Sequence, residues 1–135
     1  MDYDIVIIGG GPAGLSFACS MAGLDLNILL VEKSALESIS KPKPDGREIA
    51  LTHHSRKILI KLGVWALIDE AKVSPLKEAK VFDGGSDSLL NFDAKKSSIE
   101  ALGYLVPNHL IRAALFEKAS QAENVTILNE LVVEG

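Results

Sequence analysis

Apolar and polar positions at the start of the chain form blocks that predict two short strands with a helix between them. A run of four apolar residues leads into a glycine-rich segment, small and apolar residues follow, and a second apolar run ends at Glu32. Short apolar runs bounded by turn residues are typical of buried strands, and Gly23 is typical of a residue that ends a helix. The predicted elements are a strand at 5–8, a glycine loop at 9–14, a helix from Pro12 to about Ala22 and a strand from about Asn27 to Val31.

Beyond this unit the pattern predicts more helices and an antiparallel hairpin. The segment 34–45 contains two prolines and is too interrupted for regular structure. Apolar residues on both sides of the glycine-containing segment 83–87 are typical of a β-hairpin. The further predicted elements are helices at 47–62 and 64–71, hairpin strands around 81–82 and 89–92, a strand at 104–106, a helix from Pro107 to about Ala122, and strands at 125–128 and 131–133.

These elements predict an α/β protein. The order strand, glycine loop, helix, strand and acid is that of a Rossmann-like nucleotide-binding unit. The hairpin indicates an antiparallel β insertion at about 75–106, a β-rich excursion from the nucleotide-binding part. With 135 residues, 47% of them hydrophobic and 24% charged, the chain is one domain or less.

Charge and cysteine content change this interpretation little. The net charge of -4, with no basic stripe, gives no reason to expect nucleic acid as a partner. A single cysteine, Cys19, excludes an internal disulfide framework and fits a reducing compartment. We expect Cys19 to be a buried, inert thiol in the first helix.

The N-terminal segment does not have the composition of a targeting signal. Residues 1–4 are acidic where a secretory signal is basic, and the following apolar run is broken by glycine after four residues. A membrane span needs about twenty apolar residues. We therefore expect a cytoplasmic protein, at most peripheral to a membrane.

The glycine loop has the residues that a dinucleotide site needs. Gly9 allows a tight turn out of the strand, Gly11 lacks the Cβ that would hold a pyrophosphate away from the backbone, and Gly14 lets the helix pack closely. The helix N-terminus then faces the phosphates, and Pro12 is tolerated in its first turn. The alternative interpretation is a glycine-rich turn in an ordinary α/β domain.

Glu32 is the candidate ribose ligand. It lies eighteen residues after Gly14, close to the expected spacing, at the end of the second strand. Its carboxylate can accept hydrogen bonds from a ribose diol and would repel a 2′-phosphate. The sequence therefore predicts a site for FAD or NAD and not for NADP.

Other chemistry-bearing residues have simpler interpretations. His53 and His54 are adjacent, so their side chains diverge on a helix and we predict no metal site. Asp83 and Asp87 fit local hydrogen bonding in a turn. We interpret Trp65 as a half-buried anchor, and no catalytic residue is assigned.

Three motifs together resemble a known family, the FAD-dependent aromatic hydroxylases of the para-hydroxybenzoate hydroxylase type. Within it, the chain is most similar to the ubiquinone-biosynthesis hydroxylases. The motif at Asn108 supports this narrower resemblance, which runs over essentially the whole chain. The motifs are residues 6–15 (VIIGGGPAGL) followed by 31–33 (VEK), residues 47–52 (REIALT) with 62–65 (LGVW), and residues 102–108 (LGYLVPN).

The resemblance implies roles for particular residues. Arg47 would approach the FAD pyrophosphate, for which a guanidinium fork is suited, although a solvated charge at a helix start is the alternative. Asn108 would contact the flavin side of the cofactor or, equally, act as a helix cap. Val132 would meet the adenine through its backbone, or simply pack as a strand residue. The full set of expected cofactor-binding residues is Gly9, Gly11, Pro12, Ala13, Gly14, Glu32, Lys33, Arg47, Asn108 and Val132.

The resemblance also implies a fold and a reaction. The fold would be the N-terminal part of a glutathione-reductase-type FAD-binding domain, with the excursion at 75–106 directed towards a substrate domain. The activity would be FAD-dependent hydroxylation of an aromatic ubiquinone precursor, with NADH or NADPH as reductant. The substrate would be a small aromatic molecule that carries a prenyl tail, with a location peripheral to the inner membrane or in a biosynthetic complex.

Two further classes of function stay open at this stage. Family members are several times longer, so the resemblance implies an N-terminal fragment that is not a competent hydroxylase by itself. The first alternative is another FAD- or NAD-dependent oxidoreductase that shares the glycine loop. The second is a non-catalytic nucleotide-binding stub.

Overall fold

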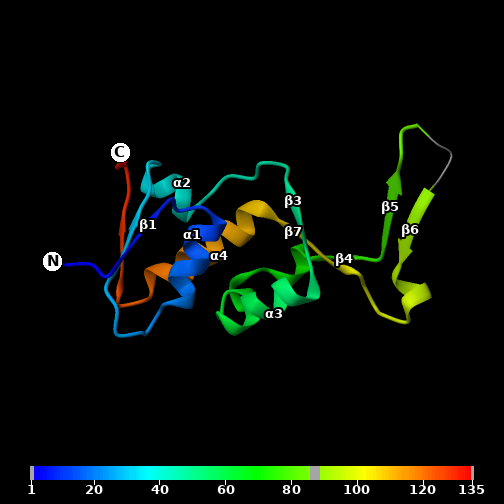
Figure 1. Cartoon of the computed structure of the whole chain (residues 1–135), viewed down its shortest axis with the longest axis horizontal. Coiled ribbons are helices and arrows are strands. Elements are labelled where there is room, and N and C mark those ends of the chain that lie inside the picture. Colours follow the sequence, from blue (N-terminus) through cyan, green and yellow to red (C-terminus); the bar gives the residue numbers. More distant parts are fainter. Residues whose placement is uncertain (1, 86–88, 135) are drawn as a thin grey trace.

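The computed structural model describes residues 2–85 and 89–134, and its nucleotide-binding part is built on a small parallel sheet (Figure 1). The order of strands is β1-β2-β8, so β2 is central. All three strands fall where the apolar runs predict them. Their bounds are β1 (Ile5–Ile8), β2 (Ile28–Val31) and β8 (Val125–Leu128), with Ile5 opposite Ile28 and Ile28 opposite Val125.

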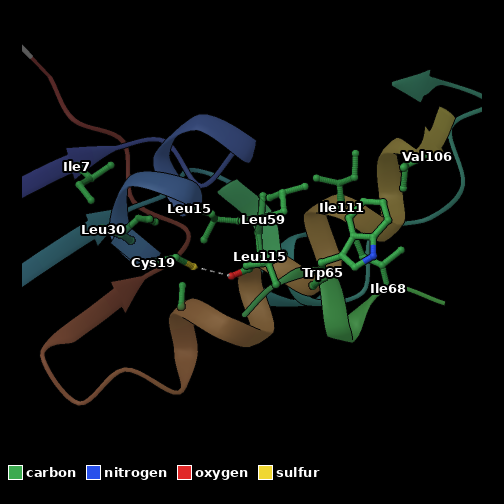
Figure 2. Packing of buried hydrophobic residues seen from close by; sticks show 14 of the residues in the cluster. Ile7, Leu15, Cys19, Leu30, Leu59, Trp65, Ile68, Val106, Ile111 and Leu115 are labelled. Atoms are coloured by element: carbon green, nitrogen blue, oxygen red, sulfur yellow. Dashed lines mark hydrogen bonds between the residues drawn. The ribbon is translucent and has the colours of Figure 1, made fainter. Parts of the chain in front are cut away.

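Two helices, α1 (Pro12–Ser20) and α4 (Asn108–Ser120), pack against each other and against one face of this sheet (Figure 2). Leu15, Leu30 and Leu115 lie at their contact and are almost fully buried. Helix α1 ends two residues earlier than predicted, in a turn that leads to Gly23, whose φ is +76°. Burial of these apolar side chains is the main stabilising contribution to this unit.

Cys19 is buried in the same core, as predicted. Its thiol donates to the backbone oxygen of Leu115 at 3.6 Å, drawn as a dashed line in Figure 2. Burial raises the pKa of Cys19 to about 11, with a smaller opposing effect of Lys118. The thiol is therefore protonated and unreactive near neutral pH.

The opposite face and the outer edge of the parallel sheet are open in the described residues. Strand β1 is an edge strand, and Val6 and Ile8, which point away from the helices, are 55% and 69% exposed. Parallel sheets are normally covered on both faces. This surface is thus an apolar part of the nucleotide-binding unit that the described residues leave uncovered.

A second sheet is antiparallel, in the order β3-β7-β4. The predicted helix at 47–62 is therefore wrong in its first part, which is a strand of this sheet, and only its second part is a helix. Apolar residues alternate at Ile49 and Leu51, and the strand pairs with β7, so pairing decides against the broken helical pattern. The elements are β3 (Glu48–Leu51), α3 (His53–Lys61), β4 (Ser74–Leu76), which was not predicted, and β7 (Gly103–Pro107).

Helix α3 begins where a side chain caps it. The Thr52 hydroxyl accepts from the backbone N–H of Ser55 at 3.1 Å, which satisfies one of the free donors of the first turn. Gly63, with φ of +71°, follows the helix end as predicted. The predicted helix at 64–71 is two 3₁₀ turns, η1 (Trp65–Leu67) and η2 (Glu70–Lys72).

The predicted hairpin is confirmed and stands away from the rest of the chain, at the right of Figure 1. Strands β5 (Glu78–Phe82) and β6 (Leu89–Asp93) are antiparallel, with Glu78 opposite Asp93. The predicted turn residues Ser86 and Asp87 lie outside the described residues. A 3₁₀ turn, η3 (Ala94–Ser97), connects β6 towards β7.

Three smaller predictions are wrong. The segment 34–45 contains a short helix, α2 (Leu36–Ser40), because both prolines follow it and buried Ile39 anchors it. Residues 131–133 are not a strand; the backbone N–H of Leu131 donates to the backbone carbonyl oxygen of Glu32 at 3.1 Å, after a turn at Glu130, whose φ is +58°. Trp65 is 6% exposed and therefore buried rather than half-buried.

No helix in the described ranges, 2–85 and 89–134, is long and apolar enough to cross a membrane.

Candidate functional site

The glycine loop between β1 and α1 has the backbone geometry that its sequence predicts. Gly9 has a φ of +106°, a conformation that favours glycine, and its N–H donates to the Val31 oxygen at 2.8 Å. A Cβ on Gly14 would overlap the carbonyl oxygen of Gly9 and lie 3.2 Å from Cγ2 of Ile7. By contrast, a Cβ on Gly11 would meet nothing within 4 Å. Gly14 is therefore required by packing, whereas Gly11 borders open space at the start of α1.

Glu32 joins the end of β2 to the glycine loop. One carboxylate oxygen, Oε2, accepts from the backbone N–H of Gly10 at 2.6 Å, and Oε1 accepts from that of Ser34 at 2.8 Å. Partial burial opposes the charged form, but the hydrogen bonds from Gly10 and Ser34 outweigh it and lower the pKa of Glu32. The Ser34 side chain and the backbone N–H of Lys33 contribute further hydrogen bonds that lower this pKa.

Arg47 and Asn108, from distant parts of the chain, meet at one carboxylate. Oδ2 of Asp45 accepts from Nη2 of Arg47 at 2.6 Å, from Nε of Arg47 at 2.9 Å and from Nδ2 of Asn108 at 2.8 Å. The Arg47 side-chain bonds, with those of Asn108 and the Arg47 backbone, hold the pKa of Asp45 well below its ordinary value. Asp45 therefore stays ionised and offsets the charge of Arg47.

The structure tests one of the two predicted roles of Asn108, that of a helix cap. Asn108 is the first residue of α4, the capping position is Pro107, and no side chain caps this helix. The cap interpretation is therefore wrong. The side chain is instead buried, and its amide bonds to Asp45.

These residues surround a cleft of about 310 Å³ that we call the phosphate cleft. It brings together residues of the glycine loop, α1, α2 and α4 with Glu32, which follows β2, and Arg47, which precedes β3. Arg112 was not predicted as a site residue, although its position one helical turn after Asn108 was a usable signal. The lining residues are Gly10, Gly11, Pro12, Glu32, Ile39, Arg47, Asn108 and Arg112.

A second cleft of about 310 Å³ lies on the other side of Glu32, and we call it the outer cleft. Lys33 and Val132, both expected at the adenine end of a cofactor, line it, and Val132 is exposed rather than packed in a strand. Glu32 lines both clefts, so a ribose beside it would connect them. Gly9 lines the outer cleft as well, while Ala13 is exposed in the first turn of α1.

A third cleft, of about 330 Å³, is apolar and lies between α1, β3, α3 and α4. Asn108 and Pro12 line both this cleft and the phosphate cleft. Ile49, Leu51 and Ile58 form much of its wall. An elongated ligand could thus place a charged group at the glycine loop and an apolar ring system beyond Asn108.

Two of the residues considered for other chemistry, His53 and Asp83, have structural partners. A ring nitrogen of His53, Nε2, lies 2.7 Å from the Ala101 oxygen, and Asp83 accepts from the N–H of Gly85 at 3.4 Å. In the portion of the chain that the structure describes, no three His, Cys, Asp or Glu side chains are grouped to hold a metal ion. Asp87, the other predicted turn carboxylate, is outside that portion.

The fold matches a class of flavin enzymes. Residues 4–40 match the family described as FAD binding domain. PqsL, a probable FAD-dependent monooxygenase from Pseudomonas aeruginosa, has a TM-score of 0.69 at 21% identity, over 95% of this chain and 33% of that chain. The flavin-dependent monooxygenase PieE, solved with FAD and substrate, also has a TM-score of 0.69, at 19% identity, over 96% of this chain and 24% of that chain. The predicted α/β FAD-binding fold is thereby confirmed.

Curated relatives narrow the relationship. Ubiquinone hydroxylase UbiM of Neisseria meningitidis is 48% identical over 135 residues, 97% of this chain and 29% of that protein. The mitochondrial ubiquinone biosynthesis monooxygenase COQ6 of Homo sapiens is 31% identical over 135 residues, 93% of this chain and 28% of that protein. The chain thus spans less than a third of the length of these relatives.

In sequence and fold the chain is similar to FAD-dependent monooxygenases. Within that group it is related to the ubiquinone-biosynthesis hydroxylases, which confirms the resemblance predicted from its motifs.

Proposed function

We propose that this chain is an FAD-binding unit whose phosphate cleft holds the diphosphate of the cofactor. The observation that carries the proposal is the convergence of Gly10, Gly11, Glu32, Arg47 and Asn108 on one cleft at the start of α1. Free N–H groups at a helix N-terminus favour an anion, and the open space at Gly11 permits close approach to the backbone. The residues present therefore fit the group.

The neighbouring clefts suit the rest of the cofactor. Glu32 would hold a ribose diol between the phosphate cleft and the outer cleft, where Lys33 and Val132 would border the adenine. Asn108 would face the flavin end, beside the apolar cleft. Glu32 also disfavours a 2′-phosphate through like-charge repulsion.

For the whole protein, we propose FAD-dependent hydroxylation of an aromatic ubiquinone precursor, with NADH or NADPH as reductant. The names of the relatives support this reaction class. Bound flavin supplies the oxygen chemistry, and the contribution of this chain is to bind and orient the cofactor and to keep water from it. The hairpin that stands away from the body supports assigning the segment 75–106 as an excursion towards a substrate domain (Figure 1). A prenylated substrate would place the protein at the inner-membrane surface or in a biosynthetic complex.

Titration of the purified, ligand-free protein with FAD tests the proposal. We expect flavin fluorescence to be quenched with saturation, and ADP to compete far better than ADP carrying a 2′-phosphate. A folded protein, verified by circular dichroism, that leaves flavin fluorescence unchanged would contradict the proposal. Preference for NAD over FAD in the same competition would instead indicate a nicotinamide enzyme.

Asp45→Asn should strengthen FAD binding, because Asp45 competes with the diphosphate for Arg47 and Asn108. Arg47 is 67% exposed, so the ion pair is screened and the expected gain is modest, about two- to fivefold in Kd. Asp69→Asn is a matched control, since Asp69 accepts from a nearby backbone N–H in a turn outside the clefts. Weaker binding by Asp45→Asn would show that Asp45 orients Arg47 rather than competing for it.

A further inference from the structure

Arg112 is a half-buried cation in the wall of the phosphate cleft. It follows Asn108 by one turn of α4, so the same face of the helix carries both residues. Within residues 2–85 and 89–134, its guanidinium makes no hydrogen bond and no ion pair. A guanidinium has five N–H donors, and those of Arg112 are in contact with the solvent of the cleft. Arg112 is therefore positioned to receive an acceptor that the chain does not provide.

The charges around the cleft also indicate that Arg112 is available to a negatively charged group. Two side-chain N–H groups of Arg47 donate hydrogen bonds to Asp45, and Glu32 contributes a second carboxylate near the cleft. A diphosphate diester brings two more negative charges. Of the two guanidinium groups that line the cleft, Arg112 is the one whose charge no bonded carboxylate offsets.

We propose that Arg112 is a phosphate-binding residue and the principal counter-charge for the diphosphate in this cleft. The inference rests on the proposed function, because it assumes a dinucleotide whose diphosphate lies at the glycine loop. A planar guanidinium can bond two phosphate oxygens at once, which a lysine cannot do. Arg112 also lines a neighbouring cleft, whose other charged residues are Glu37, Lys41 and Lys43.

The test compares Arg112→Gln with the unaltered protein in the ligand-free state. Binding of ADP and of adenosine is measured by displacement of FAD, because the two probes differ only in the diphosphate. Loss of a charge-assisted hydrogen bond should weaken ADP binding between roughly tenfold and a hundredfold. Adenosine binding should change by less than about twofold. Arg112→Lys, which keeps the charge without the fork, should fall between the two proteins.

Lys43→Gln is the matched control for charge alone. Lys43 shares the neighbouring cleft with Arg112 but does not line the phosphate cleft. We expect Lys43→Gln to leave ADP binding close to that of the unaltered protein, and both variants to unfold at an unchanged temperature.

Three results would overturn the inference. ADP binding could be unchanged in Arg112→Gln, adenosine and ADP could weaken equally, which would indicate a structural role, or Lys43→Gln could lose as much affinity as Arg112→Gln. If the unaltered protein binds neither FAD nor ADP, the proposed function fails first, and the inference fails with it.

Discussion

Gly14→Ala is expected to destabilise the nucleotide-binding unit by roughly 3 kcal/mol or more, and to abolish FAD binding with it. The added Cβ would overlap the carbonyl oxygen of Gly9, a backbone atom that cannot rotate away as a side chain could. Relief requires α1 to move from the loop, which would disturb Leu15, one of the most deeply buried side chains. Alanine favours a helix over glycine by about 1 kcal/mol, too little to offset the overlap. Urea denaturation followed by circular dichroism measures the change.

Gly11→Ala distinguishes the effect of an added Cβ on cofactor binding from its effect on the packing of the protein. A Cβ on Gly11 meets nothing within 4 Å, and the φ of -78° there is ordinary for alanine. We expect a small change in stability, together with at least about tenfold weaker FAD binding, because the methyl group would occupy the space that the diphosphate needs. Equal stability of Gly14→Ala and Gly11→Ala would refute the packing argument.

Local signals explain why the first part of the fold could be predicted. Short apolar runs, the glycine loop and an acid at the strand end lie close together in sequence, and they define β1, α1 and β2 without knowledge of the rest. Strand β3 was missed because its four residues, 48–51, depend on pairing with β7, more than fifty residues away. Helix α2 was missed because its contact with α4 and the burial of Ile39, and not its composition, stabilise it.

The residues of the candidate site also divide into those that local sequence signals predicted and those that depend on distant contacts. The glycines and Glu32 were found from spacing, and Arg47 and Asn108 from the resemblance to a family. Asp45 could not be found, since the contact that matters joins it to Asn108 across 63 positions of sequence. In the sequence, Arg112 has the position of a solvated charge on a helix. Its place in the wall of the phosphate cleft depends on the other elements that lie next to α4.

Glu32→Gln is expected to weaken both the protein and its cofactor site. The carboxylate accepts from Gly10 and Ser34 with different oxygens, whereas an amide offers one oxygen and turns an NH₂ group towards the other donor. With allowance for solvent screening, we expect a loss of about 1–2 kcal/mol in the free energy of unfolding. FAD binding should also weaken, because the ribose loses a charged acceptor.

The pH dependence of this difference has a defined sign. The folded-state pKa of Glu32 lies below its ordinary value of 4.5, so its stabilising contribution is complete above that pH and is lost as the pH falls through the lower folded-state value. Urea denaturation at a series of pH values measures the free energy of unfolding of the unaltered protein and of Glu32→Gln. The difference between these two free energies should become smaller below about pH 4.5. Glu37→Gln, which removes an exposed carboxylate in the first turn of α2, is the control, because Glu37 lines neither the phosphate cleft nor the outer cleft.

Discrimination at the 2′ position gives an independent readout of the same carboxylate. Glu32 repels a 2′-phosphate only if it faces the ribose, so Glu32→Gln should bring the affinities for ADP and for ADP with a 2′-phosphate closer together. Glu37→Gln should leave their ratio unchanged. If Glu32→Gln loses stability but keeps full discrimination, the carboxylate serves to fix the glycine loop, and the ribose must be held by another group.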